Sequence, residues 1–173
     1  MPFGKGKKWL PNARGIRSVV TGWEFNGFYT AESGTPLFLG TSTNLTNSFG
    51  GGSRPNNNGK SANLSGDTHD RLAQWFDTTV FAQPPAFTFG NTARTLPDVR
   101  DHGTNNLDVG LIKNNRFYRD GRLNLQFRSE FFNLFNRVRF GDPGLTYGTP
   151  QFGVVTSQAN SPRLIQFALK LLY

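Results

Sequence analysis

Cysteine is absent from the 173-residue sequence, and methionine occurs once. The absence of cysteine excludes disulfides, thiolate metal sites and thiol nucleophiles. Long apolar runs are missing too, because no stretch approaches the ~18 to 20 consecutive apolar residues of a membrane-spanning helix. The N-terminal residues 1–10 are basic, but Pro11 follows in place of the ~7 to 15 apolar residues of a secretory signal. If the protein is exported, we expect its signal to lie outside this chain.

The composition favours an all-β fold. Only 36% of residues are apolar, yet 14% are aromatic, with 17 Phe and 20 Gly. Helical cores normally contain more Leu, Ala and Met, whereas aromatic residues mixed with Gly, Asn, Thr and Ser are typical of strands and long loops. The net charge of +8 suits an anionic partner such as nucleic acid, phospholipid or lipopolysaccharide. The basic residues are spread along the chain, so a solvated basic surface explains the charge equally well.

Apolar residues alternate with polar ones in several segments, which indicates strands. The pattern predicts an antiparallel meander of about five strands, near 18–30, 34–42, 105–116, 122–136 and 163–173. A turn signal at Ser33-Gly34 predicts that the first two form a hairpin. A helix competes over 122–136, because Leu123, Phe127 and Phe131 are also spaced by four. The unbroken polar parity from Asn124 to Glu130 favours a strand.

The connections alternate between short and long, with loops expected at about 43–104 and 137–162. Loops of this length are rare in compact soluble domains, but transmembrane barrels carry long loops on one side. A barrel presents its apolar face to lipid and its polar face to the lumen, whereas a soluble sandwich buries the apolar face in a core. In a barrel, the lumen-facing residues would be Asp108, Asn124, Gln126, Arg128, Glu130 and Lys170. The loop alternation puts Tyr29, Phe117 and Tyr173 near the inner rim, and Phe131, Phe132 and Phe135 near the outer rim.

Motifs for chemistry are weak, and we expect no enzyme, cofactor or metal site. Gly59-Lys60-Ser61 resembles the end of a phosphate-binding loop, but Arg54 stands where its first glycine belongs. The polar side chains around His69 match no calcium or zinc spacing. Neither His69 nor His102 accompanies a serine-centred nucleophile motif.

Aromatic and arginine residues are interleaved in the first long loop. Such residues can stack on sugars, bases or aromatic ligands. The alternative is that they pack together as a small core that orders the loop. The candidate ligand residues are Arg71, Trp75, Phe76, Phe81, Phe87 and Arg94.

Several stretches together resemble the end of the TonB-dependent receptor family, especially its Oar-like transporters with a carboxypeptidase-regulatory-like N-terminal domain. The order and spacing of the stretches carry the resemblance, and the run Phe-Phe-Asn-Leu-Phe-Asn at 131–136 is the strongest. The matching segments are 2–7, 22–27, 33–36, 75–77, 87–91, 106–108, 125–136 and 162–170.

The resemblance implies a barrel of about twenty-two strands plugged by an N-terminal domain, which takes up scarce nutrients across the outer membrane of a Gram-negative bacterium. Five strands are fewer than the ~8 that close the smallest barrel, so we expect a C-terminal segment that does not function alone. The implied partners are outer-membrane lipid and lipopolysaccharide, the missing barrel strands and plug, the barrel-assembly machinery, and TonB through the missing N-terminal part. Nucleic acid is not among them.

The resemblance also implies that the barrel-assembly machinery recognises the terminal strand. The expected signal consists of one parity of that strand, namely Ile165, Phe167, Leu169, Leu171 and Tyr173. Two alternatives remain. One is a soluble basic β-protein that binds polysaccharide or nucleic acid through its aromatic loops, and the other is an adhesion or assembly barrel without transport.

Overall fold

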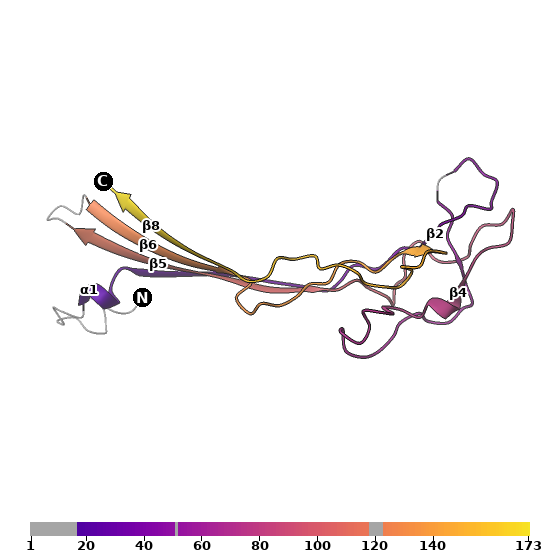
Figure 1. Cartoon of the computed structure of the whole chain (residues 1–173), viewed down its shortest axis with the longest axis horizontal. Coiled ribbons are helices and arrows are strands. Elements are labelled where there is room, and N and C mark those ends of the chain that lie inside the picture. The colour runs from indigo at the N-terminus through magenta and orange to yellow at the C-terminus, as the bar shows by residue number, and fades with distance from the viewer. Residues whose placement is uncertain (1–16, 51, 118–122) are drawn as a thin grey trace. The chain divides into compact units, whose positions relative to one another are not determined.

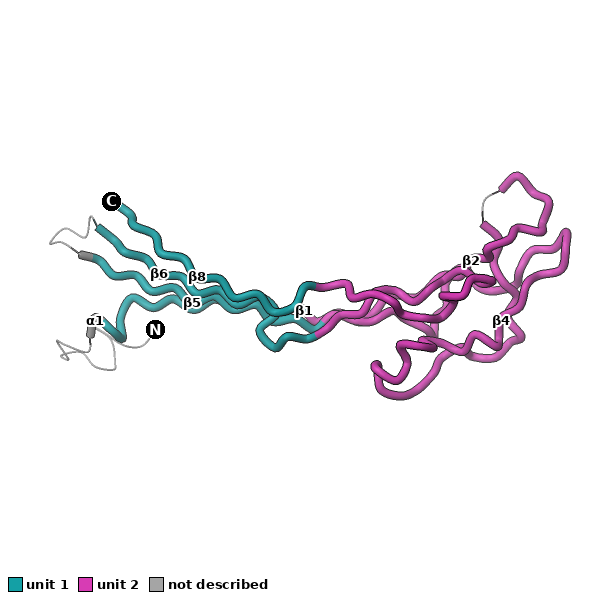
Figure 2. Tube along the Cα trace, viewed as in Figure 1, with its two compact units in different colours: residues 1–30, 105–137, 161–173 teal, residues 31–104, 138–160 magenta. Residues whose placement is uncertain are grey.

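The computed structural model describes residues 17–50, 52–117 and 123–173. The fold is all-β, as predicted, apart from a helical turn, α1 (Arg17–Val20), and a 3-10 turn, η1 (Thr78–Val80). The chain divides into two compact units (Figure 2). Unit 1 comprises residues 1–30, 105–137 and 161–173, and unit 2 comprises 31–104 and 138–160. Within the described residues, no helix has the length and apolar character needed to cross a membrane.

Unit 1 is built on a four-stranded antiparallel sheet, with strands in the order β1-β5-β6-β8 (Figure 1). The strands are β1 (Trp23–Glu32), β5 (Thr104–Phe117), β6 (Leu123–Phe132) and β8 (Leu164–Leu172). These long strands pair in sequence order, so the predicted meander is confirmed for them. The strand prediction over 122–136 is confirmed for β6 as well, and the competing helix is wrong. The predicted tight connection at 118–121 lies outside the described residues.

The registers place alternate residues on two different faces. Gln126 pairs with Asn114 on one side and with Lys170 on the other, whereas Phe127 pairs with Lys113 and Leu169. Successive side chains of a strand point to opposite faces. One face therefore carries mostly polar residues and the other mostly apolar residues. We call them the polar face and the apolar face.

The predicted start of the first strand is wrong. Val19 lies in the helical turn α1, and its carbonyl oxygen accepts a hydrogen bond from the indole Nε1 of Trp23 at 2.6 Å. The strand begins only after Gly22, whose φ of 76° suits glycine best. The alternation of apolar residues extends back to Val19, but residues 19–22 do not form a strand.

The predicted hairpin at Ser33-Gly34 is also wrong. Gly34 passes so close to the backbone of Asp101 that a Cβ would collide with it, and Pro36 forms a bridge with Arg100. Gly34 thus permits two segments of the chain to approach closely and does not form a turn. Of the predicted strand 34–42, only β2 (Gly40–Thr41) forms, and it pairs in parallel with β7 (Thr146–Tyr147). Leu37 and Leu39 alternate because both are buried in unit 2.

Because no hairpin follows β1, the predicted position of Tyr29 changes. Antiparallel pairing brings the end of β1 beside the start of β5, since Gly27 lies against Asp108. Phe131 pairs with Val109 at this same end of the sheet. Tyr29 therefore belongs with Phe131 and Phe132, at the end from which both long connections leave, and its predicted place beside Tyr173 is wrong.

Unit 2 contains most of the two predicted loops and has a hydrophobic core of its own. It also holds the small sheet of β3 (Asn56–Asn57) and β4 (Phe81–Ala82). Phe76 is fully buried and makes edge-to-face contacts with Phe81 and Phe152 at centroid distances of 6.0 and 5.2 Å. The segments predicted as loops therefore form an ordered unit. Its core residues are Leu37, Leu39, Ala62, Trp75, Phe76, Val80, Phe81, Leu96 and Val99.

Candidate functional site: the polar face of the sheet

A chain of side-chain amides crosses the polar face. The Nδ2 group of Asn114 donates to the carboxylate of Glu24 in β1 at 2.8 Å. The Oδ1 atom of Asn114 accepts hydrogen bonds from Asn124 Nδ2 and Gln126 Nε2, both at 2.9 Å. Three strands are thereby joined through side chains on one face. Lys170 of β8 stands opposite Gln126 and extends the polar row to the fourth strand.

The six residues predicted to share one face do so. Arg128 pairs with Ile112 and Glu130 with Gly110, which places both on the same face as Asp108 and Asn114. Two atoms of this set, Nε of Arg128 and Oδ1 of Asn124, are buried without a hydrogen-bond partner in the described part of the chain. Buried polar atoms normally have partners, so these two positions suit water or further chain segments above the polar face.

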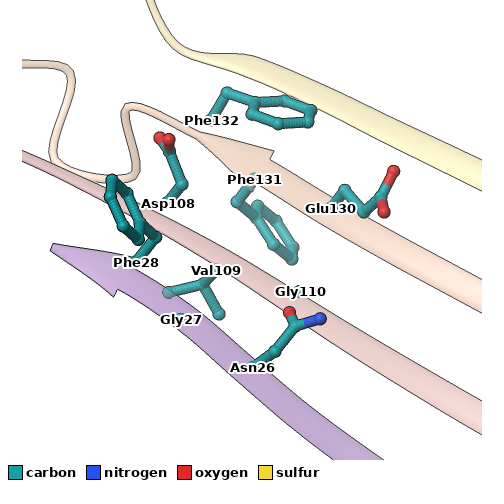
Figure 3. A pocket seen from close by; sticks show the side chains of 9 residues that line it. All are labelled: Asn26, Gly27, Phe28, Asp108, Val109, Gly110, Glu130, Phe131 and Phe132. Carbon is teal, nitrogen blue, oxygen red and sulfur yellow. The ribbon is translucent and has the colours of Figure 1, made fainter.

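The polar face contains a hollow of about 370 Å³ at the bare backbone of Gly110 (Figure 3). A Cβ at Gly110 would collide with the amide oxygen of Asn26, so the missing side chain makes room for Asn26. The strand parity puts Phe28 and Phe132 on this face together with the carboxylate of Glu130. The full lining is Asn26, Gly27, Phe28, Asp108, Val109, Gly110, Glu130, Phe131 and Phe132.

The hollow combines acidic, amide and aromatic groups. Asp108 already accepts hydrogen bonds from Asn106 Nδ2 at 2.9 Å and from the backbone N–H of Asn133 at 2.8 Å. The chemistry that remains suits a polar solute with hydrogen-bond donors or a cationic group, which aromatic rings also attract. Sequence reasoning missed Asn26, Phe28 and Phe132 in this role. Gly110 was the available signal, because a glycine inside a strand often marks a close approach.

The apolar face is exposed on the two edge strands and half-buried on the apolar residues of β6. Phe25 and Tyr29 of β1 are exposed, and Phe167 and Leu169 of β8 are 65% and 67% exposed. The rings of Phe127 and Phe167 stack across β6 and β8 with centroids 6.0 Å apart. The predicted assembly residues Ile165, Phe167, Leu169 and Leu171 all lie on this face, and Tyr173 follows the strand fully exposed. Large apolar side chains exposed in a row on one face mark a site of contact with lipid or protein.

One lysine interrupts the apolar face. Lys113 pairs with Phe127, and its ammonium lies 5.5 Å from the centroid of the Trp23 ring. The ammonium also donates to the backbone carbonyl of Thr21. The aliphatic part of the Lys113 side chain can thus cover apolar surface while its ammonium reaches the residues just before β1, as lysines do near a membrane interface.

The candidate ligand residues of unit 2 separate into two groups. Trp75, Phe76 and Phe81 are buried in the core of unit 2 and present almost no surface to a ligand, as a small core that orders the loop predicts. Phe87 and Arg94 are exposed, and the guanidinium of Arg71 lies 4.6 Å from the centroid of Trp75.

The two histidines of the chain contact the same ring. His69 and His102 contact Phe140 edge-to-face at centroid distances of 5.5 and 5.3 Å. Among the described residues, no group of three His, Asp or Glu side chains is placed to hold a metal ion.

One comparison with known proteins identifies a family. A family model described as an outer membrane beta barrel domain matches residues 1–166. No curated protein and no solved structure matches the chain.

Proposed function

Because the chain belongs to the outer membrane beta barrel domain family, we propose that it forms the C-terminal part of a TonB-dependent transporter that takes up nutrients, and that it is not an enzyme. The observation that supports this proposal best is the division of the sheet into two faces. Transmembrane barrel strands alternate apolar residues toward lipid with polar residues toward the lumen. The stretches that resemble TonB-dependent receptors supply the finer assignment.

In this proposal, the polar face lines the path of the solute. Arg128 and Lys170 then face the lumen, because a basic side chain facing lipid at the bilayer midplane costs about 2–4 kcal/mol. Glu130 shares their face and lines the lumen with them. The hollow at Gly110 lies at the end of the sheet from which the long connections leave. Long connections of outer-membrane barrels are extracellular, so a solute would reach the hollow early on its path.

The apolar face contacts outer-membrane lipid, and the exposed aromatic residues near the strand ends belong to the interfacial girdles. Among the described strands, β1 and β8 form the two edges of this sheet. In the proposal these edges pair with strands of the remaining barrel, as closure of a barrel requires.

The competing soluble protein that binds nucleic acid through its loops is not favoured. Unit 2 contains six basic and seven acidic side chains, so it lacks the excess of positive charge that binding to phosphates requires. The basic excess of the chain belongs to unit 1.

Transport is tested by deleting the gene that encodes this chain in the source bacterium and comparing the compounds removed from a complex medium. We expect at least one compound to be depleted by the parent strain but not by the deletion strain. A protonophore should abolish this difference, because uptake through TonB is energised. Identical depletion by both strains would favour the adhesion or assembly barrel instead.

A further inference from the structure

The run Phe-Phe-Asn-Leu-Phe-Asn at 131–136 belongs to strand β6 only in its first two residues. Strand β6 stops at Phe132, and the backbone N–H of Asn136 donates to the carbonyl of Asn133 at 2.8 Å, which closes a turn. Both asparagines have a positive φ, 50° for Asn133 and 52° for Asn136. Asparagine tolerates this left-handed conformation better than other residues with a side chain.

Both asparagine side chains bind the chain segment that leads into β8. The Nδ2 group of Asn133 donates to the carbonyls of Arg137 at 2.9 Å and Ser161 at 3.2 Å, and its Oδ1 accepts from the N–H of Arg137 at 2.9 Å. The Oδ1 of Asn136 accepts from the N–H of Arg163 at 2.9 Å. Asn133 is only 8% exposed, so the hydrogen bonds of its side-chain amide are shielded from water.

The same turn is fixed to strand β5 on its other side. The backbone N–H of Asn133 donates to the carboxylate of Asp108, and the N–H of Leu134 donates to the carbonyl of Leu107, both at 2.8 Å. The turn at 133–136 therefore binds β5 and the approach to β8 at the same time. All of these residues belong to unit 1.

The pairing of β6 with β8 needs such a fixed point. A slip of β8 by one residue would exchange its two faces, and the apolar side chains prevent it. A slip by two residues would leave Ile165, Phe167 and Leu169 on the apolar face, so the alternating pattern does not oppose it. Tight turns normally set the register of neighbouring strands, but more than thirty residues separate Phe132 from Leu164.

We propose that Asn133 and Asn136 act as a register clamp that selects the pairing of the terminal strand β8 on β6. A slip of two residues moves β8 by about 7 Å along β6. Such a shift would break the bonds from Asn133 to Ser161 and from Asn136 to Arg163. The slip would leave the buried side-chain amide of Asn133 without its partner at Ser161 and would also break the exposed bond from Asn136 to Arg163, which favours the native register by about tenfold or more.

The clamp also fixes what β8 presents at its free edge. That edge displays the N–H and C=O groups with which the next strand of a barrel must pair. A correct register on β6 is therefore a condition for a correct closing pair. This inference goes beyond the proposed function, because the clamp acts in any protein that contains this sheet, whether or not it transports a nutrient.

The absence of cysteine makes the register directly measurable by disulfide formation. The native register is reported by a cysteine pair at Ser129 and Phe167, or at Arg128 and Ala168. Close and wide pairs alternate along an antiparallel ladder, so one of these two pairs has the ~4.5 Å Cα spacing that a disulfide bridges. The slipped registers are reported by pairing the same β6 position with a β8 position two residues away.

The experiment uses the full 173-residue chain, refolded in detergent micelles and oxidised under exchange conditions. We expect the native pair to exceed the slipped pairs at least tenfold in the chain with both asparagines. In the variant Asn133→Gly with Asn136→Gly, we expect this ratio to fall by tenfold or more, because glycine keeps the positive φ but removes the amides. Asn47→Gly is the matched control, since Asn47 also has a positive φ, 58°, but lies in unit 2.

Two results would overturn the clamp. One is an unchanged ratio of native to slipped disulfides in the double glycine variant. The other is a loss of the native ratio in the double alanine variant but not in the glycine variant, which would assign the effect to backbone shape alone. Neither result bears on uptake, so the clamp and the proposed function fail independently.

Discussion

The side chain of Asn26 in β1 occupies the space that a side chain at position 110 of β5 would need. Replacing Gly110 with alanine should therefore force Asn26 away from the hollow and destabilise the sheet by about 1–3 kcal/mol, the usual cost of overpacking. Denaturant unfolding in detergent micelles measures the change. Gly52→Ala is the control, because no atom lies within 4 Å of a Cβ built there. Equal effects of the two substitutions would show that Asn26 does not require the glycine.

Unit 2 should depend on Phe76 far more than on its exposed aromatic residues. Phe76→Ala removes a fully buried ring and should destabilise unit 2 by about 3–5 kcal/mol. Phe38→Ala, at a position that is 64% exposed, should change stability little. Limited proteolysis provides the measurement, with early cleavage inside 31–104 expected for the Phe76 variant alone. Resistance of both variants would mean that this core does not hold unit 2 together.

Acid should weaken the turn that begins at Asp77. Hydrogen bonds from the hydroxyl and the backbone N–H of Thr79 hold the pKa of the Asp77 carboxyl below its ordinary value of 3.8. A depressed pKa in the folded state gives a stabilisation that is complete above the unfolded pKa and disappears as the pH falls through the folded pKa. We expect Asp77→Asn to reduce the loss of thermal stability below pH 4. Asp142→Asn, which removes an exposed carboxylate of the same unit, should leave that loss unchanged. A wild-type pH profile in the Asp77 variant would contradict the assignment.

The terminal strand should govern assembly in the full-length protein. Deleting Tyr173, or changing Phe167 to Asp, should sharply lower the amount of heat-modifiable barrel in the outer membrane. The reason is that an edge strand with a regular apolar face is a template for strand addition. Tyr29→Ala removes another exposed aromatic residue at the opposite end of the sheet and should have a milder effect. Undiminished assembly without Tyr173 would leave that residue as an interfacial anchor only.

The sequence predicted the long strands well because their signal is local. Alternation from Leu107 to Leu111 and from Leu123 to Phe131 depends on each strand having one apolar face, and a strand shows this by itself. The hairpin prediction was wrong because a glycine such as Gly34 can either form a turn or permit a close approach of two backbone segments. Only the position of the distant Asp101 decides between these roles.

The site was predictable only in part for the same reason. Parity alone placed Asp108, Arg128 and Glu130 on one face. The hollow depends on the contact between Asn26 in β1 and Gly110 in β5. These residues are 84 positions apart in the sequence, so no local pattern reveals the contact. The sequence leaves two roles open for Trp75 and Phe76, ligand contact or a small core, because a buried aromatic residue and an exposed one look alike in a loop without periodicity.

We expect the polar face of the sheet to line a lumen and the apolar face to contact lipid. Single nitroxide labels at Leu169 and Lys170, adjacent residues of β8, test it in the full-length protein in outer-membrane vesicles. The label at 169 should collide mainly with oxygen, which concentrates in lipid, and the label at 170 mainly with a water-soluble nickel chelate. Extending the scan from Ile165 to Leu171 should give accessibilities that alternate with a period of two. Equal accessibility of both labels to the nickel chelate, without alternation along β8, would mean that the two faces of the sheet do not divide between lumen and lipid.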